Sequence, residues 1–230
     1  MISHSFNDIE IIFENKDYLV VNKPHNLAVI KGRNRDDKWT LYETLQRKYK
    51  NLFIVHRLDA ATGGIMVFAK NQHTQKFLSN LFMNGEVYKE YLCICEGVLK
   101  NPLTLMLPIS KVNNHGKYNI NFKSGRKSIT TFYPLYHNNK SSIVLALPKT
   151  GRTHQIRLHL KAIDVPLYYD YIYNKKDNIS VIPLCLVCIA FECVIFRIKP
   201  GIYLYELSNQ LSFDLDYILK YNCKILKNYS

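Results

Sequence analysis

The β-rich segments of this chain follow one another in runs, and this pattern limits the fold more than any other feature. Short turn signals separate them, namely Asn-Asn and Ser-Gly pairs at residues 113–114, 124–125 and 138–139. A doubly wound parallel sheet would instead place a helix after almost every strand. Since fewer segments have helical periodicity, the sequence predicts an α+β fold with a mixed, mainly antiparallel β-sheet core flanked by helices.

Periodicity also places the individual elements. Apolar and β-branched runs predict strands at residues 10–13, 18–21, 65–69, 87–95, 118–122, 129–136, 143–147 and 184–191. Apolar residues three and four apart predict helices at residues 41–49, 74–83, 153–163 and 215–221. The length of 230 residues allows one large domain or two small ones.

The charge balance points to a polyanionic partner. The chain has 31 Lys and Arg against 18 Asp and Glu, a formal net charge of +13. With 47% hydrophobic and 21% charged residues the composition is that of a globular protein, which excludes a disordered tail or a collagen-like fibre. A folded chain this basic is typical of proteins that bind nucleic acid or an anionic membrane surface.

Much of the positive charge lies in one stretch. Residues 97–163 contain no Asp or Glu. The basic residues of this stretch are Lys100, Lys111, Lys117, Lys123, Arg126, Lys127, Lys140, Lys149, Arg152, Arg157 and Lys161. Solvated loops with a drifting composition are one explanation. We favour the other, a face that binds a polyphosphate.

Neither a membrane nor a metal is expected as a partner. The opening residues lack the basic and apolar regions of a secretion signal, and the longest apolar stretch, residues 181–191, is too short to span a membrane. We therefore expect a cytoplasmic protein with reduced thiols. Cys185 and Cys188 have the spacing of a metal-binding pair, but they lie in an apolar predicted strand and are interpreted as core residues.

Two clusters carry chemistry. In residues 56–64, His-Arg-Leu-Asp precedes two glycines and a strand, and Asp59 could cap a turn, pair with Arg57, or act as a nucleophile or base. Spacing alone favours the turn cap. In residues 151–159, Arg157 shares a helix face with His154, so this helix start is either an anion site or a solvated basic helix, and the residues do not separate the two.

Taken together, four ordered segments resemble the signatures of the RluA family of RNA pseudouridine synthases. Residues 20–24 match a VNKP element, residues 56–64 the HRLDxxTSG signature, residues 89–97 a KxYxAxxxG strand and residues 151–159 the GRTHQIRxH element. Residues 165–170 are a looser version of a His-Pro-x-x-x-Asp element. The resemblance implies a pseudouridine-synthase fold in a single catalytic domain over residues 1–230, with two sub-halves around a central RNA-binding cleft.

The chain departs from the family pattern at several positions. Gly63 stands where the family usually has Ser, Cys93 stands where Ala is usual, and a late Leu-His-Ala segment reads Leu-Cys-Leu at residues 184–186. We also expect a member without the S4-type RNA-binding domain that many members carry at the N-terminus. These differences concern RNA docking and substrate choice rather than the catalytic set.

The resemblance also implies roles for individual residues. The catalytic set is Asp59, Tyr91 and Arg157: Asp59 acts on the ribose, Arg157 pairs with it, and Tyr91 stacks on the detached uracil or lies near the departing proton. The expected substrate and RNA contacts are His56, Arg57, Thr62, Lys89, Arg152, His154, Gln155 and Leu184. Isomerisation of uridine in a tRNA or rRNA stem-loop needs no cofactor. The alternative is a catalytically silent RNA-binding protein of the same fold.

Overall fold

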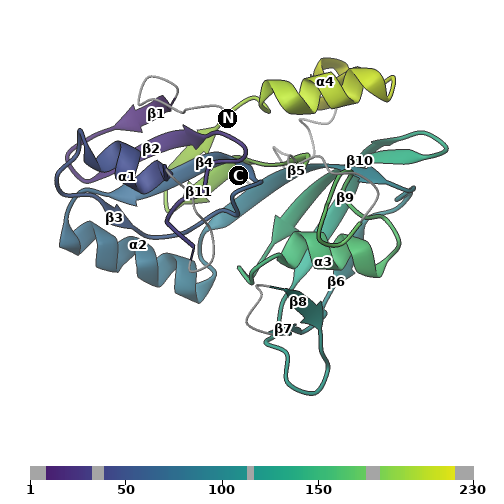
Figure 1. Cartoon of the computed structure of the whole chain (residues 1–230), viewed down its shortest axis with the longest axis horizontal. Helices are drawn as coiled ribbons and strands as arrows, with labels where there is room; N and C mark the ends of the chain where they lie inside the picture. Colours follow the sequence, from purple (N-terminus) through teal and green to yellow (C-terminus); the bar gives the residue numbers. More distant parts are fainter. Residues whose placement is uncertain (1–8, 33–38, 113–116, 175–181, 221–230) are drawn as a thin grey trace. The chain divides into compact units, whose positions relative to one another are not determined.

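The computed structural model describes residues 9–32, 39–112, 117–174 and 182–220, which divide into two compact units (Figure 1). The first unit comprises Met1–Lys89 and Cys185–Lys199, and the second comprises Glu90–Leu184 and Pro200–Ser230. The predicted cleft between two sub-halves stays a prediction.

The first unit is built on a mixed sheet. Its strands lie in the order β1 (Glu10–Glu14), β2 (Tyr18–Lys23), β4 (Gly63–Ala69) and β11 (Leu184–Phe191). The first two pairings are antiparallel, whereas β11 runs parallel to β4. Two short strands, β3 (Phe53–Ile54) and β12 (Val194–Arg197), pair with β4 and β11. All seven residues of β4 are buried, as expected for a strand covered on both faces.

Two capped helices accompany this sheet. The helix α1 (Leu41–Gln46) begins at Thr40, whose hydroxyl accepts from the Glu43 amide at 3.2 Å. The helix α2 (Gln72–Asn84) begins at Asn71 in the same way and ends at a left-handed Gly85. It packs against β3 and β4. These local signals explain where each helix begins and why α2 stops at residue 84.

The second unit contains an antiparallel sheet. Its strands lie in the order β5 (Tyr88–Glu96), β10 (Ser141–Pro148), β9 (Thr130–His137) and β6 (Leu103–Leu105). The helix α3 (Gln155–Ala162) packs against β9. A separate hairpin joins β7 (Ile109–Lys111) to β8 (Tyr118–Ile120), and α4 (Ile202–Gln210) follows near the end of the chain. Within the described residues, no helix has both the length and the apolar character needed to cross a membrane.

The predicted α+β class with a mixed, mainly antiparallel sheet is confirmed. Every predicted strand overlaps an observed one, but β3, β6, β7, β12 and α4 were missed. Strands of two to four residues are too short to display alternation. The predicted strand at residues 118–122 ends at Ile120, because Asn121 starts a turn. The last residue of the predicted C-terminal helix, 221, lies outside the described residues.

Candidate active site

Asp59 lies in a tight turn that leads into β4. The Thr62 amide donates to the Asp59 carbonyl at 3.0 Å, so residues 59–62 form a hydrogen-bonded turn. The Asp59 side chain is half-buried, Thr62 is almost fully buried, and Arg57 two residues earlier is exposed. The turn therefore holds a carboxylate at the edge of a rigid strand, where a ligand can approach it.

Lys23, in the VNKP segment, holds this turn through a hydrogen bond. Its side chain is 1% exposed, and its Nζ donates to the carbonyls of Pro24 and Leu27 at 2.8 Å and of Ala60 at 3.1 Å. Burial lowers the pKa of the Lys23 ammonium to about 7, and the negative charge of Asp59 partly opposes this shift. Sequence reasoning placed the VNKP segment in the family but missed its link to the turn.

His56 is also part of the support for the turn. Its Nε2 accepts from the Val67 amide of β4 at 3.0 Å, and its ring stacks on Phe82 with centroids 4.5 Å apart. Burial lowers the pKa of His56 to about 3, with the positive charge of Lys89 adding to the effect. His56 is therefore a neutral acceptor that ties the loop to the sheet, and its predicted contact with RNA stays a prediction.

Position 64, the second of the two glycines after the turn, requires glycine. Its φ is +113°, and a Cβ there would lie 2.3 Å from the carbonyl oxygen of Leu186 on β11. Only glycine allows both the left-handed backbone and so close a parallel strand. Gly64 thus allows β11 to lie against the start of β4.

In the second unit, Arg157 of α3 forms a buried ion pair with Asp170. Its Nε lies 2.8 Å from Oδ2 and its Nη2 lies 2.6 Å from Oδ1, and the two side chains are 2% and 1% exposed. Oδ1 also accepts from the amides of Ile172 and Tyr173 at 3.2 Å. The looser His-Pro-x-x-x-Asp element included Asp170, but the sequence did not predict that Asp170 pairs with Arg157. Pairing of Arg157 with Asp59 joins residues of two units and stays a prediction.

Aromatic rings surround this ion pair. The Arg157 guanidinium carbon lies 5.1 Å from the centre of the Tyr173 ring, within reach of a cation–π interaction. The Tyr173 hydroxyl is 2.7 Å from Nδ1 of His154, which precedes α3 in a left-handed conformation with φ of 56°. His154 thus links the helix start to Tyr173, and its predicted contact with RNA stays a prediction.

Gln155 has a structural position. It is 4% exposed, and its Oε1 accepts from the Thr150 hydroxyl at 2.8 Å and from the Arg152 amide at 3.0 Å. Its Nε2 donates to the Ile129 carbonyl and the Thr130 hydroxyl. Its amide holds the loop before α3 against β9, and the predicted RNA contacts of Gln155 and of the half-buried Arg152 stay predictions.

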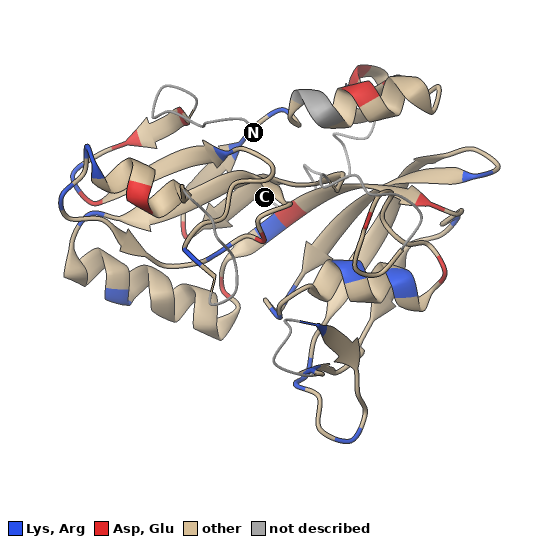
Figure 2. Ribbon diagram, viewed as in Figure 1, with Lys and Arg blue, Asp and Glu red and all other residues tan. Residues whose placement is uncertain are grey.

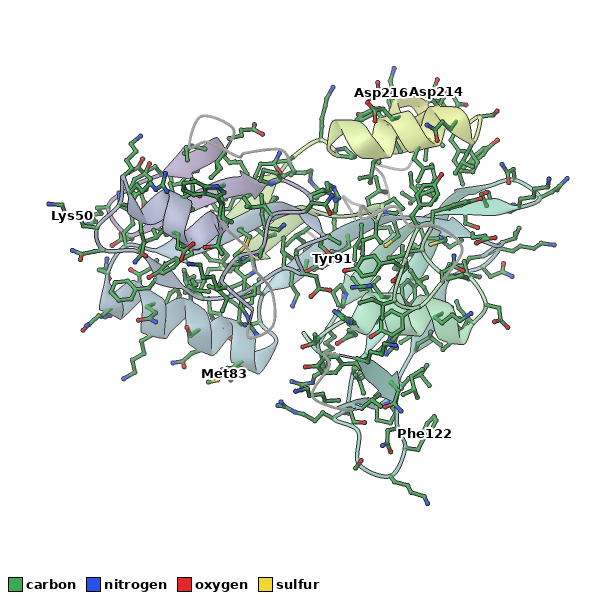
Figure 3. The ribbon with its side chains drawn as sticks, in the orientation of Figure 1. Lys50, Met83, Tyr91, Phe122, Asp214 and Asp216 are labelled. Carbon is green, nitrogen blue, oxygen red and sulfur yellow. The ribbon has the colours of Figure 1, made fainter. Side chains whose placement is uncertain are left out.

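Three further predicted residues lie on strands. Tyr91 is half-buried on β5, opposite Ala146 of β10 (Figure 3). Lys89 is 8% exposed, and its ammonium lies 6.0 Å from the centre of the Phe82 ring. Burial lowers the pKa of Lys89 to about 8. Leu184 is 4% exposed at the start of β11, and the predicted contacts of Lys89 and Leu184 with substrate or RNA stay predictions.

A basic projection of the second unit, residues 107–112 and 117–128, is called the arm. Its Lys and Arg have no Asp or Glu among them (Figure 2). The exposed basic residues are Lys111, Lys117, Lys123, Arg126 and Lys127. Its base is held by reciprocal amide–carbonyl bonds between Ile109 and Arg126 at 3.0 and 2.8 Å. Arg152 joins the arm by donating to the Lys127 carbonyl at 3.1 Å.

The last residue of the second cluster anchors the arm to α3. The Ser128 hydroxyl donates to the Leu107 carbonyl, so the Nε2–H of buried His159 must be the donor in its 2.9 Å bond to Ser128. At the outer loop, Asn121 Oδ1 accepts from the amides of Lys123 and Ser124. This turn presents Phe122, 77% exposed, to solvent (Figure 3).

In the described parts of the chain, no three His, Cys, Asp or Glu side chains are grouped closely enough to hold a metal ion. Cys185 and Cys188 are buried thiols of β11.

Known proteins are similar to this chain over a range that includes both clusters. Residues 17–162 match the family described as RNA pseudouridylate synthase. A dual-specificity RNA pseudouridine synthase RluA of Vibrio cholerae is 30% identical over 174 residues, which cover 75% of this chain and 71% of that protein. An uncharacterized RNA pseudouridine synthase of Mycoplasma genitalium is 34% identical over 178 residues, covering 74% of this chain and 56% of that protein.

Solved structures are similar as well. Human RNA pseudouridylate synthase domain containing 1 aligns with a TM-score of 0.76 at 25% identity, covering 90% of this chain and 89% of that chain. Human RNA pseudouridylate synthase domain containing 4 aligns with the same TM-score at 21% identity, covering 88% and 93%. The second likeness concerns the fold alone.

Proposed function

Because the chain belongs to the RluA family of RNA pseudouridine synthases, we propose that it isomerises specific uridines in a structured RNA, a stem-loop of tRNA or rRNA, with Asp59 as the reacting carboxylate. The observation that carries this proposal is the braced turn, in which Lys23 holds the residue after Asp59. A carboxylate on a fixed turn keeps its orientation toward a bound ribose.

The reaction asks little of the protein beyond positioned groups. The C1′–N1 bond breaks, the uracil turns in place, C1′ bonds to C5, and the proton leaves C5 while N1 gains one. Atoms and electrons balance without an oxidant, a metal or an energy source. Asp59 can attack C1′ or take a ribose proton, and both routes need it ionised beside the sugar.

We propose supporting roles for Arg157 and Tyr91. The bidentate bond to Asp170 fixes the plane of the Arg157 guanidinium, and a fixed guanidinium suits pairing with the Asp59 carboxylate. Tyr91 offers a ring face for the detached uracil and a hydroxyl that can accept or relay the C5 proton. Arg57, exposed beside Asp59, is proposed to fill the space left by the extruded nucleotide.

The arm is proposed to bind the RNA backbone. Its exposed lysines and arginines project from a hairpin without acidic neighbours, and RNA stems present rows of phosphates. Arg152, which bonds to the arm, would extend this surface toward the start of α3. Phe122 on the outer loop can stack on an unpaired base.

The proposal is tested by Asp59→Asn. RNA labelled with tritium at C5 of uridine, prepared from a strain that lacks this gene, should release tritium with the wild-type protein and not with the variant. Asp164→Asn is the matched control, since Asp164 is exposed and has a left-handed φ of 57° that Asn also tolerates. Wild-type release by Asp59→Asn would overturn the assignment. RNA binding without conversion by the wild-type protein would favour the silent RNA-binding alternative.

A further inference from the structure

His25, two residues after Lys23, makes a second bond to the turn that carries Asp59. Its Nδ1 lies 2.8 Å from the carbonyl oxygen of Ala61. A carbonyl only accepts hydrogen bonds, so Nδ1 must carry the proton. Lys23 thus holds the carbonyl of Ala60 and His25 holds the next one, and both central residues of the turn are fixed by side chains from one segment.

The same ring occupies the space beside Gly63. A Cβ built on Gly63 would lie 2.5 Å from Cδ2 and Nε2 of His25, well inside van der Waals contact. A Ser at position 63, usual in the family, would therefore push the ring away and break its bond to Ala61. The φ of Gly63 needs no glycine, since it lies outside the left-handed range in which Gly64 is found. The ring, and not the backbone, excludes a side chain at this position.

The His25 side chain is half-buried and neutral. Burial lowers its pKa to about 4, and the charge of Lys23 contributes in the same direction. A single tautomer with the proton on Nδ1 therefore persists across the physiological range, and the bond to Ala61 does not change with pH there.

From these contacts we infer that His25 and Gly63 act as one unit that positions the turn carrying Asp59, with His25 a positioning residue for the reaction. The inference rests on the proposed role of Asp59. It also explains the departure from Ser at position 63: the missing side chain makes room for a second brace on the turn. Because the bond of His25 is to the turn, we expect its effect on the reacting step rather than on RNA binding.

The test separates chemistry from binding. Single-turnover tritium release is followed with protein in excess over C5-labelled RNA from the deletion strain. His25→Ala should lower the saturating rate about 10- to 100-fold, while the half-saturating protein concentration stays within about twofold. His25→Asn should restore most of the rate, because its amide N–H can replace Nδ1–H. His73→Ala, an exposed histidine of α2, is the control.

A double-mutant cycle tests the coupling. Gly63→Ser should lower both the saturating rate and the urea midpoint. In Gly63→Ser with His25→Ala the ring is gone, so the rate should match that of His25→Ala alone within about threefold instead of showing the product of both losses. Independent, multiplicative losses would overturn the inference, as would an unchanged rate in His25→Ala.

The urea midpoints of the cycle distinguish failure of the proposed function from failure of the positioning role. If the wild-type protein converts no uridine, the proposed function fails, while the urea midpoints still report whether positions 25 and 63 are coupled. Coupling in the midpoints with unchanged rates would mean a merely structural contact and would overturn the positioning role. Coupling in both rates and midpoints supports it.

Discussion

At the scale of single residues, specific partners hold two of the cationic side chains that the described chain buries. Arg157 is paired with Asp170, and Lys23 donates to three carbonyls. Removing one partner of such a group leaves a desolvated charge behind, which costs more than the bond itself contributes. Substitutions at these residues therefore report on the site more sharply than substitutions on the surface.

Asp170→Asn should destabilise the protein strongly. The variant keeps the side-chain size but leaves the Arg157 cation buried without a counter-charge, at a cost of about 3–5 kcal/mol. Urea denaturation measures this as a lower midpoint with an unchanged slope. Asp214→Asn at an exposed position is the control. A decrease of less than about 1 kcal/mol in the free energy of unfolding would contradict a buried, uncompensated charge.

His56 should make the free energy of unfolding depend on pH. Its pKa is about 3 in the folded protein against 6.5 ordinarily, so between these values the unfolded chain binds a proton that the folded protein does not. Stability therefore falls as the pH falls from 6.5 toward 3, by up to about 1.4 kcal/mol per pH unit. His56→Gln keeps an acceptor for the Val67 amide and cannot titrate.

Urea midpoints measured from pH 7 down to about 4 should therefore fall less steeply in His56→Gln than in the wild type. His73→Gln, at an exposed histidine, should keep the wild-type slope. Equal slopes in His56→Gln and the wild type would show that His56 is not held neutral by its surroundings.

At the scale of elements, the arm combines a rigid base with an exposed outer loop. Gly125 donates to the Asn121 carbonyl at 2.8 Å, and a Cβ on Gly125 would clash with that oxygen at 2.3 Å. The loop is therefore closed by its own backbone. A preformed loop loses little entropy when it binds, which suits a contact with unpaired nucleotides.

Phe122→Ala should weaken binding to the labelled RNA, because stacking of one base contributes about 1–3 kcal/mol, or about 5- to 150-fold in affinity. Phe122→Tyr should retain most of the affinity. Met83→Ala, 78% exposed on α2, removes an equally exposed apolar side chain outside the arm. Equal affinities of Phe122→Ala and Met83→Ala in a filter-binding titration would exclude the stacking contact.

At the scale of the whole molecule, a net charge of +13 should make RNA binding strongly dependent on salt. Each phosphate contact contributes a slope of about −0.7 to −0.9 in log K against log salt. Lys123→Ala should reduce the slope by about one contact, whereas Lys50→Ala, exposed in the first unit, should leave it unchanged. A binding constant that does not change across moderate salt would contradict the electrostatic surface.

Local patterns in the sequence were enough for the fold class, most strands and the two clusters. Alternation and helical spacing act over a few neighbours, so long elements such as β5 and α2 could be predicted, whereas the two-residue β3 could not. Spacing alone favoured a turn-capping role for Asp59. The structure places Asp59 in a turn closed by its own backbone carbonyl, and only the family signature assigns it chemistry.

The sequence by itself determined which residue types are present and in what order: the His-Arg-Leu-Asp cluster, the basic helix start and the acid-free stretch. Tertiary structure alone decided their partners, because those partners lie far along the chain and meet only by packing. Lys23 and Ala60 are 37 positions apart, and Arg157 and Asp170 are 13. Tertiary structure also decided which basic residues are exposed, since Arg157 is buried in an ion pair while the lysines of the arm remain in solvent.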